Sequence, residues 1–594
     1  MKALLSLNRY FFRYKYHLLL GVLFVVLSNL FAIYPAQIVR ESFDLVAEKI
    51  TDYQKLPDGK ERDFFYSVFE TAVLRYGLLI VAMALLRGLF LFFMRQTIIV
   101  MSRHIEYDQK NDIYAHYQRL PLRFYRKNNT GDLMARISED VGRVRMYTGP
   151  AIMYGINLLV LFVMVISYMI SVNAEFTFYV LLPLPFLSIL VYFLNNLIEK
   201  KSDQIQKSLS RLSTVVQEAF SGIRVIKAFG KEKDSLRIFA SESEQYRNQS
   251  IGLGNVNAWF SPLIMTLIGA SSIITVYVGG LQVMAGKIST GNIAEFLIYV
   301  NMLTWPVTSL GWVMSIAQRA AVSQIRINEF LNEKNEIVST QNIETPIRGK
   351  IEFQHVNFTY PDTGIQALQD ISFVIHPGQS IGILGHTGCG KSTLANLVCR
   401  LFDADQGKIL IDDLPIEAYR PEALRKQMGY VPQDVFLFSD TIANNIRFGN
   451  PALGHEAIEK ASIQAHLMEN IERFENQFDT MIGERGITLS GGQKQRVSIA
   501  RALILQPRVL ILDDCLSAVD TQTENIILNH LREEMKDKTT MIISHRISSV
   551  KMADKILVLD DGKIAQQGTH ESLMAVPGLY KELYERQLTT EEVE

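Results

Sequence analysis

Six long apolar segments in the amino-terminal half constrain the fold of this chain more than any other feature. A helix that crosses a bilayer needs about 20 mostly apolar residues, because each residue adds about 1.5 Å along the axis. The segments lie at residues 17–34, 72–93, 152–172, 176–194, 259–280 and 293–317. The fourth contains Pro183 and Pro185, which a membrane helix tolerates where neighbouring groups satisfy the freed carbonyls. The pattern predicts an α-helical membrane domain with six transmembrane helices.

The basic residues of the connecting segments predict the orientation of these spans. The turn at 173–175 has no Lys or Arg, and the turn between the fifth and sixth spans has only Lys287. The segments after the second and fourth spans are long and basic, with Arg119, Arg123, Arg126, Lys127, Arg136, Arg143 and Arg145 in the first and Lys200, Lys201, Lys207, Arg211, Arg224, Lys227 and Lys231 in the second. Because Lys and Arg are retained on the cytoplasmic side, we expect these segments and the basic amino terminus to be cytoplasmic. The outer loop at 36–70 also contains basic residues, Lys49, Lys55, Lys60 and Arg62, but its acids outnumber its Lys and Arg residues.

The two cytoplasmic segments are too long to be turns and have apolar residues at helical spacing. One such stripe consists of Val215, Ala219, Gly222, Ile223 and Ile226. This spacing predicts that the membrane helices extend tens of ångströms into the cytoplasm. A separately folded loop domain is the alternative.

The character of the sequence changes twice in its second half. Polar and charged residues dominate 319–349, which predicts a linker after a membrane domain at 1–318. From residue 350 to 594 short apolar runs alternate with helical patterns, and the clearest runs are SIGILG, RVLILDD, TTMIIS and KILVLDDG. Such runs are typical of strands buried in a mainly parallel sheet. The expected fold is therefore an α-helical membrane domain joined to an α/β domain.

Composition excludes several other classes of function. With 594 residues the chain is too long for one hydrophobic core. Its net charge of -1 creates no global basic field, so we expect no nucleic-acid partner. Cys389, Cys399 and Cys515 have neither zinc-ligand nor disulfide spacing. The first apolar run is followed by no small-residue cleavage site, so we expect the amino terminus to be retained rather than removed as a signal peptide.

A glycine-rich sequence after the predicted strand at 380–384 matches the phosphate-binding loop G-x-x-x-x-G-K-[ST]. Glycines let backbone N–H groups approach phosphate oxygens. Lys391 is expected to reach the β- and γ-phosphates and Ser392 to hold Mg²⁺. An ordinary glycine-rich turn is the alternative. The motif predicts a P-loop NTPase core that binds ATP and Mg²⁺ through Gly385, His386, Thr387, Gly388, Cys389, Gly390, Lys391, Ser392 and Thr393.

Two adjacent acids, Asp513 and Asp514, end the predicted strand at 509–514. In a P-loop protein Asp513 would contact the hydrated Mg²⁺, and Asp514 would lie beside the water that attacks the γ-phosphate. Two acids at the end of a strand also occur in ordinary solvated turns. Their position about 120 residues after the phosphate-binding loop favours the functional interpretation.

Further motifs resemble those of the ATP-binding-cassette (ABC) family. Leu489-Ser-Gly-Gly-Gln493 resembles the family's signature motif. Tyr360 in FTYP resembles the aromatic residue that stacks on adenine, and Gln433 in YVPQD resembles the glutamine that senses Mg²⁺ and water. His545 in SHR resembles the histidine that contacts the γ-phosphate. The resemblance implies that the catalytic residues are Asp514, His545 and Gln433. It implies that the Mg²⁺ ligands are Ser392, Gln433 and Asp513.

Four loop segments extend the resemblance over nearly the whole chain. Gly483–Gly486 resembles the loop that contacts coupling helices in exporters, and Ser517–Asp520 resembles the loop between paired cassettes. In the membrane half, Phe124-Tyr125 with residues 130–141 resembles the first cytoplasmic coupling segment of half-size exporters, and residues 217–229 resemble the segment that leads on from the second. The chain thus resembles half-size ABC exporters of the multidrug and lipid-flippase type.

This resemblance implies that one chain is half of a dimeric transporter. In the family the signature motif faces the phosphate-binding loop of the opposite cassette. ATP held by a partner chain would therefore contact Leu489, Ser490, Gly491, Gly492, Gln493 and Asp520. The expected partner is a second half-transporter, in a plasma membrane such as the bacterial inner membrane. ATP binding would close the cassettes and hydrolysis would release them, which gives alternating access.

One residue departs from the family pattern. Glu normally follows the Mg²⁺-binding acid, whereas this chain has Asp514. Asp is one methylene shorter, so its carboxylate would fall about 1–1.5 Å short of the attacking water, a misplacement that can cost about a hundredfold in rate. The same substitution occurs in the weakened site of heterodimeric exporters, so we expect the degenerate-site member of a heterodimer. A slower homodimer is the alternative, because His545 and the signature motif are intact.

The resemblance alone indicates the substrate, a large amphipathic molecule such as a drug or lipid. Arg87 lies in the second span, where a charge is costly unless it faces a cavity, contacts a partner or extends to the membrane surface. Several polar and aromatic residues of the spans could line a cavity: Asn157, Asn301, Thr304, Trp305 and Trp312. Such residues also pack between helices, which is the alternative. Two other functions fit the same scaffold: a peptide or siderophore transporter, and a nucleotide-gated channel or regulatory membrane protein.

Overall fold

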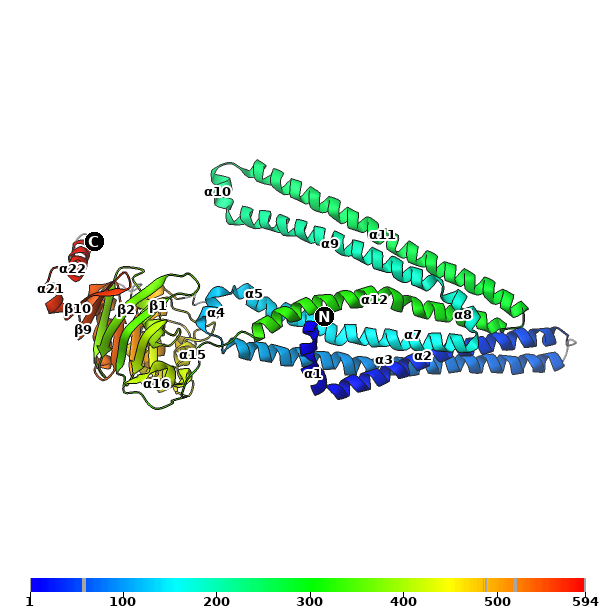
Figure 1. The fold of residues 1–594 in the computed structure, drawn as a ribbon, viewed down its shortest axis with the longest axis horizontal. Helices are drawn as coiled ribbons and strands as arrows, with labels where there is room; N and C mark the ends of the chain where they lie inside the picture. Colours follow the sequence, from blue (N-terminus) through cyan, green and yellow to red (C-terminus); the bar gives the residue numbers. More distant parts are fainter. Residues whose placement is uncertain (1, 56–59, 484–485, 487–488, 517–520, 592–594) are drawn as a thin grey trace. The chain divides into compact units, whose positions relative to one another are not determined.

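The computed structural model describes residues 2–55, 60–483, 486, 489–516 and 521–591 of the chain. The chain divides into two compact units, which contain the helices and strands labelled in Figure 1. The helical unit comprises Met1–Tyr117 and Gly131–Asn332, and the α/β unit comprises Gln118–Thr130 and Glu333–Glu594. Both halves of the expected fold class are therefore present.

Six helical segments of the helical unit are long and apolar enough to cross a membrane, as predicted. α3 alone has 58 residues, which is roughly 85 Å at 1.5 Å per residue, more than twice the hydrocarbon thickness of a bilayer. The helices thus extend beyond the bilayer, and the described residues of this unit hold no separately folded loop domain. The helices that contain the spans are α2 (Lys15–Lys55), α3 (Lys60–Tyr117), α7 (Ile152–Val172), α8 with α9 (Ala174–Leu181, Pro183–Ser221), α11 (Glu232–Met284) and α12 (Thr290–Leu331).

Prolines shape two of these segments. The fourth is interrupted at Leu182, because Pro183 has no N–H to donate to the preceding turn. Before α7, Pro150 lies in a wide π-helical turn that keeps the helix continuous. The elements that lead into α7 are α5 (Thr130–Ala135), η2 (Arg136–Asp140), α6 (Val141–Met146) and η3 (Tyr147–Ala151).

Aromatic and amide side chains hold the span helices together. Phe176 of α8 stacks on Phe296 of α12 with ring centroids 4.4 Å apart, and both side chains are fully buried. Asn29 of α2 donates to the side-chain oxygen of Asn157 of α7 at 2.9 Å. Asn157, a predicted cavity-lining residue, thus makes a contact between helices.

A buried carboxylate is paired with a partly buried guanidinium in the same bundle. The Glu295 side chain of α12 has no exposed surface and lies 3.6 Å from the guanidinium of Arg40 of α2. Tyr299 and Asn292 donate to the two oxygens of Glu295 at 3.0 and 3.1 Å. Arg40 also donates to the hydroxyl of Tyr168 of α7 at 3.0 Å. Because the carboxylate has both an opposite charge and hydrogen-bond donors, the bundle can hold it without water.

A six-stranded sheet organises the α/β unit. Its strand order is β10-β9-β3-β8-β7-β6, with parallel pairing from β9 to β6 and an antiparallel edge strand β10. The apolar runs predicted as buried, mainly parallel strands are therefore confirmed. The strands are β3 (Ser380–Gly385), β6 (Met428–Val431), β7 (Val509–Asp513), β8 (Thr539–Ile543), β9 (Lys555–Asp560) and β10 (Lys563–Gly568).

A second, antiparallel sheet of order β2-β1-β4-β5 completes the unit, with β1 (Ile351–Thr359), β2 (Gln366–Ile375), β4 (Gln406–Ile411) and β5 (Leu414–Pro415). The α-helices of this unit that follow residue 333 are α13 (Lys391–Val398), α14 (Pro421–Arg425), α15 (Ile442–Arg447), α16 (His455–Gln464), α17 (Met468–Ile471), α18 (Gly491–Leu503), α19 (Thr521–Met535), α20 (Ile547–Val550), α21 (His570–Met574) and α22 (Leu579–Glu591). In open α/β sheets ligands bind beyond the carboxyl ends of parallel strands, which is where the phosphate-binding loop lies.

The boundary between the units differs from the predicted one. Helix α12 continues past residue 318 to Leu331, so the first part of the predicted linker is helical. The reason is burial, because Ala320, Ile327 and Phe330 continue the apolar face of the helix with 0–2% of their surface exposed. The segment Gln118–Thr130, placed in the membrane domain by its sequence position, belongs to the α/β unit.

Candidate functional site

The backbone of the phosphate-binding loop requires glycine at two positions. Gly388 and Gly390 have φ values of 88° and 98°, in the left-handed region that favours glycine. A Cβ atom on Gly390 would lie 2.3 Å from the carbonyl oxygen of Ala367, so a side chain cannot fit there. The loop follows β3 and leads directly into α13, so its N–H groups and the helix N-terminus form a place for an anion.

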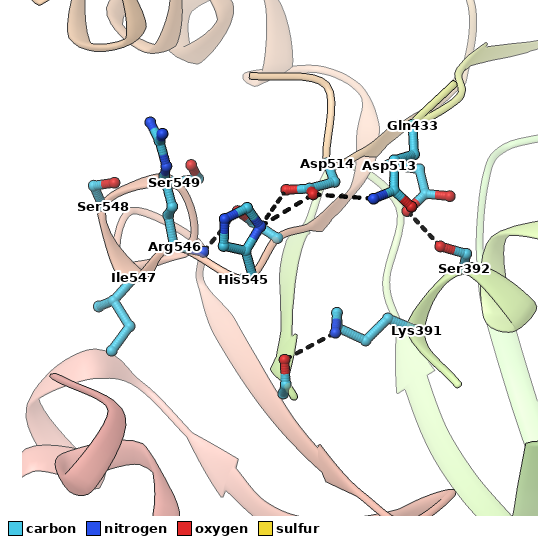
Figure 2. Close-up of polar contacts among 12 residues, drawn as sticks. Lys391, Ser392, Gln433, Asp513, Asp514, His545, Arg546, Ile547, Ser548 and Ser549 are labelled. Atoms are coloured by element: carbon cyan, nitrogen blue, oxygen red, sulfur yellow. Dashed lines mark hydrogen bonds and ion pairs between the residues drawn. The ribbon is translucent and has the colours of Figure 1, made fainter. Parts of the chain in front are cut away.

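The sheet brings the predicted phosphate lysine and Mg²⁺ ligands to one edge (Figure 2). β3 and β7 both pair with β8 in parallel, so their carboxyl ends lie at the same edge. The Ser392 hydroxyl donates to Oδ1 of Asp513 at 2.9 Å. The Lys391 ammonium donates to the carbonyl oxygens of Gly385 and His386 at 2.8 and 2.7 Å. These three side chains come from motifs about 120 residues apart in the chain.

Asp513 lies in an environment that disfavours its charge. Only 2% of its surface is exposed, and burial raises the pKa of its carboxyl to about 6. The Ser392 hydrogen bond lowers this pKa, whereas the charge of Asp514 raises it further. Burial likewise raises the pKa of the neighbouring Tyr430 phenol. A divalent cation would reverse this preference by stabilising the carboxylate.

The donor atoms at this edge suit Mg²⁺. Mg²⁺ prefers oxygen ligands and binds through one or two carboxylates together with phosphates and water. The Asp513 carboxylate and the Ser392 hydroxyl are already 2.9 Å apart, so both can face one small ion without rearrangement. Gln433 offers an amide next to Asp514, to which its Nε2 donates at 3.4 Å.

The predicted catalytic residues meet around Asp514 (Figure 2). Its φ of 46° turns the chain immediately after β7, and its N–H donates to the carbonyl oxygen of Ile543 at 2.8 Å. Asp tolerates this left-handed conformation better than most residues. Nδ1 of His545 lies 2.9 and 3.0 Å from the two carboxylate oxygens. The Asp514 carboxylate is thus held between His545 and Gln433.

Tyr360, the predicted adenine platform, lies beside the same loop. Its hydroxyl is 3.0 Å from Oγ1 of Thr393, in the first turn of α13. Its ring stands at 89° to that of Phe402 with centroids 5.6 Å apart. The ring and the predicted phosphate site are therefore joined by a direct hydrogen bond.

The signature motif forms the start of a helix. Ser490 caps α18: its hydroxyl accepts the N–H of Gln493 at 3.3 Å, and the Gln493 side chain accepts the N–H of Ser490 at 2.9 Å. Ser490 and Gly491 are exposed, whereas Leu489 is buried in the hydrophobic core. The motif therefore presents an exposed helix N-terminus, and the buried Leu489 side chain fixes it to the hydrophobic core. Asp520 and the rest of Ser517–Asp520, and residues 484–485 of the Gly483–Gly486 loop, lie outside the described residues.

Glu524 supports the site and is missing from the sequence-based set. It is 1% exposed, forms an ion pair with Arg546, and accepts hydrogen bonds from Ser548 and Ser549 at 3.1 and 2.6 Å. These contacts fix the segment that follows His545. The sequence did contain a signal for this role: Glu524 is an acid three positions before Ile527, on the apolar face of a helical run.

Comparison with known proteins agrees with this geometry. Residues 18–307 match the family described as ABC transporter transmembrane region, and residues 368–517 match the family described as ABC transporter. This chain is an ABC transporter. Its fold class, its six spans and its resemblance to half-size exporters are thereby confirmed, and as an ABC transporter it couples ATP hydrolysis to transport.

Several curated ABC transporters are similar over most of their length. The probable multidrug resistance ABC transporter ATP-binding/permease protein of Bacillus subtilis is 37% identical over 80% of this chain and 82% of its own. The multidrug resistance-like ATP-binding protein MdlA of Escherichia coli is 33% identical over 99% of this chain and 97% of its own. The ATP-dependent lipid A-core flippase of Pseudomonas fluorescens is 33% identical over 85% of this chain and 84% of its own. The roles of individual site residues in this ABC transporter stay predictions.

Proposed function

We propose that the chain is one half of a dimeric exporter that uses ATP to move an amphipathic substrate out of the cytoplasm. Two kinds of relative support the substrate class, since drugs and lipid A-core are both amphipathic. The orientation expected from the basic loops supports a plasma membrane with the amino terminus and the α/β unit in the cytoplasm.

One observation carries the proposal. The α/β unit holds two complementary parts of a nucleotide site, the Lys391–Ser392–Asp513 edge and the exposed helix N-terminus at Ser490. A helix N-terminus favours an anion. In the ABC family this N-terminus contacts ATP held by the opposite cassette, so two chains complete two sites.

In this proposal each side chain has a defined task. The loop N–H groups and Lys391 bind the phosphates, so Lys391 exchanges the carbonyls of Gly385 and His386 for phosphate oxygens. Ser392, Asp513 and Gln433 would hold Mg²⁺, which would supply neutralisation of phosphate charge when bound with ATP. Tyr360 stacks on adenine.

Asp514 and His545 orient the attacking water, and here the geometry supports a weakened site. The short Asp514 carboxylate is held by His545 at 2.9 Å and by Gln433 at 3.4 Å. A carboxylate held one methylene back from the usual position aligns water poorly. We therefore favour a heterodimer whose other half contributes Glu at the corresponding position.

Exposed apolar residues on the α9–α11 arm support a partner chain. Phe220 at the end of α9 is 73% exposed, and Val225 and Phe229, within and just after α10 (Ile223–Ala228), are 61% and 76% exposed. Clustered apolar exposure of this kind marks interaction surfaces. In the ABC exporter family the corresponding segment couples the membrane helices to a cassette.

Aromatic residues in the helical unit support an amphipathic substrate. Trp305 and Trp312 of α12 remain 54% and 42% exposed, and both lie edge-on to Tyr154 of α7 at 5.4 and 5.6 Å. By contrast, Asn301 and Thr304 donate to backbone carbonyls one turn earlier in their own helix. The two tryptophans are thus the better candidates for contact with a substrate.

Reconstitution in vesicles tests the proposed function. The full chain, alone and with a candidate second half-transporter, should be assayed for ATPase activity and for uptake of a lipophilic cationic dye and a fluorescent lipid analogue into inverted vesicles. The pair is expected to give ATP-dependent, vanadate-sensitive uptake, and Lys391→Ala in this chain should reduce it strongly. Full turnover by the chain alone would contradict the heterodimer, and ATP-gated ion conduction without uptake would contradict export.

A further inference from the structure

A short helix from between two membrane helices lies against the proposed adenine platform. α4 (Leu122–Lys127) lies in the segment Gln118–Thr130, which belongs to the α/β unit although helices of the other unit flank it in the chain. The guanidinium carbon of Arg126 in α4 is 4.4 Å from the centroid of the Tyr360 ring. This distance is well within the range of a cation–π contact.

An acidic residue fixes the guanidinium in that position. Arg126 forms an ion pair with Asp362 at 3.1 Å, and the Asp362 side chain is only 18% exposed. The backbone also ties Asp362 to the ring, since a turn joins the N–H of Gly364 to the carbonyl of Tyr360 at 2.8 Å. The contact is therefore a small built cluster and not one flexible side chain resting on a ring.

The same tyrosine leads to the phosphate-binding loop. The Tyr360 hydroxyl is 3.0 Å from Oγ1 of Thr393, in the first turn of the helix that follows the loop. Phe358 and Phe402 stand at 84° and 89° to the ring and limit its rotation. Continuous contacts thus join Asp362 and Arg126 to Tyr360 and then to Thr393.

We propose that Arg126 is a positioning residue for the nucleotide: it holds Tyr360 in the orientation that stacks on adenine and so links the docking of α4 to ATP binding. The inference rests on the proposed function, which assigns adenine to Tyr360. Because linkage is reciprocal, a docked α4 strengthens ATP binding, and bound ATP strengthens the docking of α4 by the same factor.

The chain offers a matched control in the same helix. Arg123 of α4 donates to both carboxylate oxygens of Glu336 at 3.0 Å, so it also ties α4 to the α/β unit. Its partner is Glu336 rather than the Tyr360 ring. If α4 mattered only as a structural tether, loss of Arg123 and loss of Arg126 would have similar effects.

The test compares Arg126→Ala, Arg126→Lys, Arg123→Ala and Tyr360→Ala in the full chain with its partner in lipid nanodiscs. ATP affinity is measured by displacement of a fluorescent trinitrophenyl-ATP, and KM and kcat by ATP hydrolysis. Arg126→Ala is expected to raise the Kd and KM for ATP about two- to fivefold with little change in kcat, given the usual strength of a cation–π contact. Arg126→Lys should restore part of the affinity because it keeps the charge, and Arg123→Ala should stay near wild type.

A second readout follows the reciprocal effect. ATP should slow hydrogen exchange in peptides covering residues 118–130 of the wild type, and slow it less in Arg126→Ala. Unchanged or tighter ATP binding by Arg126→Ala, or an equal loss in Arg123→Ala, would overturn the inference. If Tyr360→Ala also leaves ATP affinity unchanged, the adenine assignment fails; if only Tyr360→Ala weakens binding, the assignment stands and the role of Arg126 fails.

Discussion

Glu295 in the helical unit and Asp513 in the α/β unit are both almost completely buried carboxylates, with 0% and 2% of their surface exposed. Glu295 has its counter-charge inside the fold, in Arg40, and accepts two hydrogen bonds from its own helix. Asp513 accepts a hydrogen bond from Ser392 and lies beside a second acid, so burial raises the pKa of its carboxyl. We interpret the first as a charge that stabilises the fold and the second as a charge that the proposed function keeps for Mg²⁺. Substitutions should therefore affect stability at the first site and nucleotide chemistry at the second.

The largest effect is expected where the internal pair is broken. Glu295→Ala leaves the partly buried Arg40 with the exposed Glu41 as its remaining ion-pair partner, which should destabilise the protein by about 3 kcal/mol, the lower end for loss of one member of a buried pair. The apparent Tm of the purified full chain in detergent would report this loss. A double variant, Arg40→Met with Glu295→Leu, should recover much of the Tm because it removes both charges. Equal Tm values for Glu295→Ala and wild type would show that the pair is not structural.

The next effect concerns the length of Asp514, the acid that we propose to orient the attacking water. Asp514→Glu moves the carboxylate forward by one methylene and should raise kcat for ATP hydrolysis by up to about a hundredfold. The left-handed φ of 46° at this position suits Asp better than Glu, so part of the gain will be lost to backbone strain. Asp514→Asn, which keeps the length but not the charge, is the control and should show no gain. An unchanged kcat in Asp514→Glu would place the limit of turnover elsewhere.

The smallest effect depends on pH. Burial raises the pKa of Asp513 from 3.8 to about 6 in the ligand-free fold, so the folded state holds this proton more tightly than the unfolded chain does. The resulting stability is fully present below about pH 4 and is lost as the pH rises through about 6. Asp513→Asn has no such loss, so its ligand-free form should be more stable than wild type at pH 8, by about 1–2 kcal/mol, and this advantage should disappear near pH 4.

Added MgATP should reverse this difference in stability at pH 8, so that wild type becomes more stable than Asp513→Asn. Wild type gains stability from a ligand that binds the folded state, whereas Asp513→Asn has no carboxylate for Mg²⁺. Thermal shift at pH 8 with and without MgATP measures both differences. A wild-type protein that is more stable than Asp513→Asn even without ligand would show that Asp513 is a structural charge like Glu295.

The sequence was most informative where one motif or period sufficed. Apolar length predicted the spans, and the G-x-x-x-x-G-K-S motif with the strand that ends in Asp513 predicted one edge, where Ser392 contacts Asp513 because parallel strands bring their carboxyl ends together. It was less informative where tertiary contacts decide. Polar composition suggested a linker from residue 319, but the buried Phe330 keeps α12 helical to Leu331.

Pairings between distant residues were also beyond the sequence. Asn157 is a polar residue in an apolar span, and only its 2.9 Å contact with Asn29 shows that it packs between helices. Likewise Arg126 looked like one of many basic residues in a cytoplasmic loop, and its contact with Tyr360 depends on how the chain folds back. Neither partner lies within reach of a helical or strand period, so no local pattern could reveal it.

The backbone passes between the two units after Tyr117, after Thr130 and again after Asn332. The α/β unit is therefore not joined to the helical unit by a single linker. One of its segments, Gln118–Thr130, lies in the sequence between two parts of the helical unit. A protease cut within 333–349 would leave Gln118–Thr130 covalently attached to the membrane helices, and the ion pairs Arg123–Glu336 and Arg126–Asp362 would still link that piece to the detached fragment unless the cut removed Glu336. Gene fusions or domain swaps made at residue 333 alone would therefore separate Glu336 and Asp362 from Arg123 and Arg126, their partners in α4.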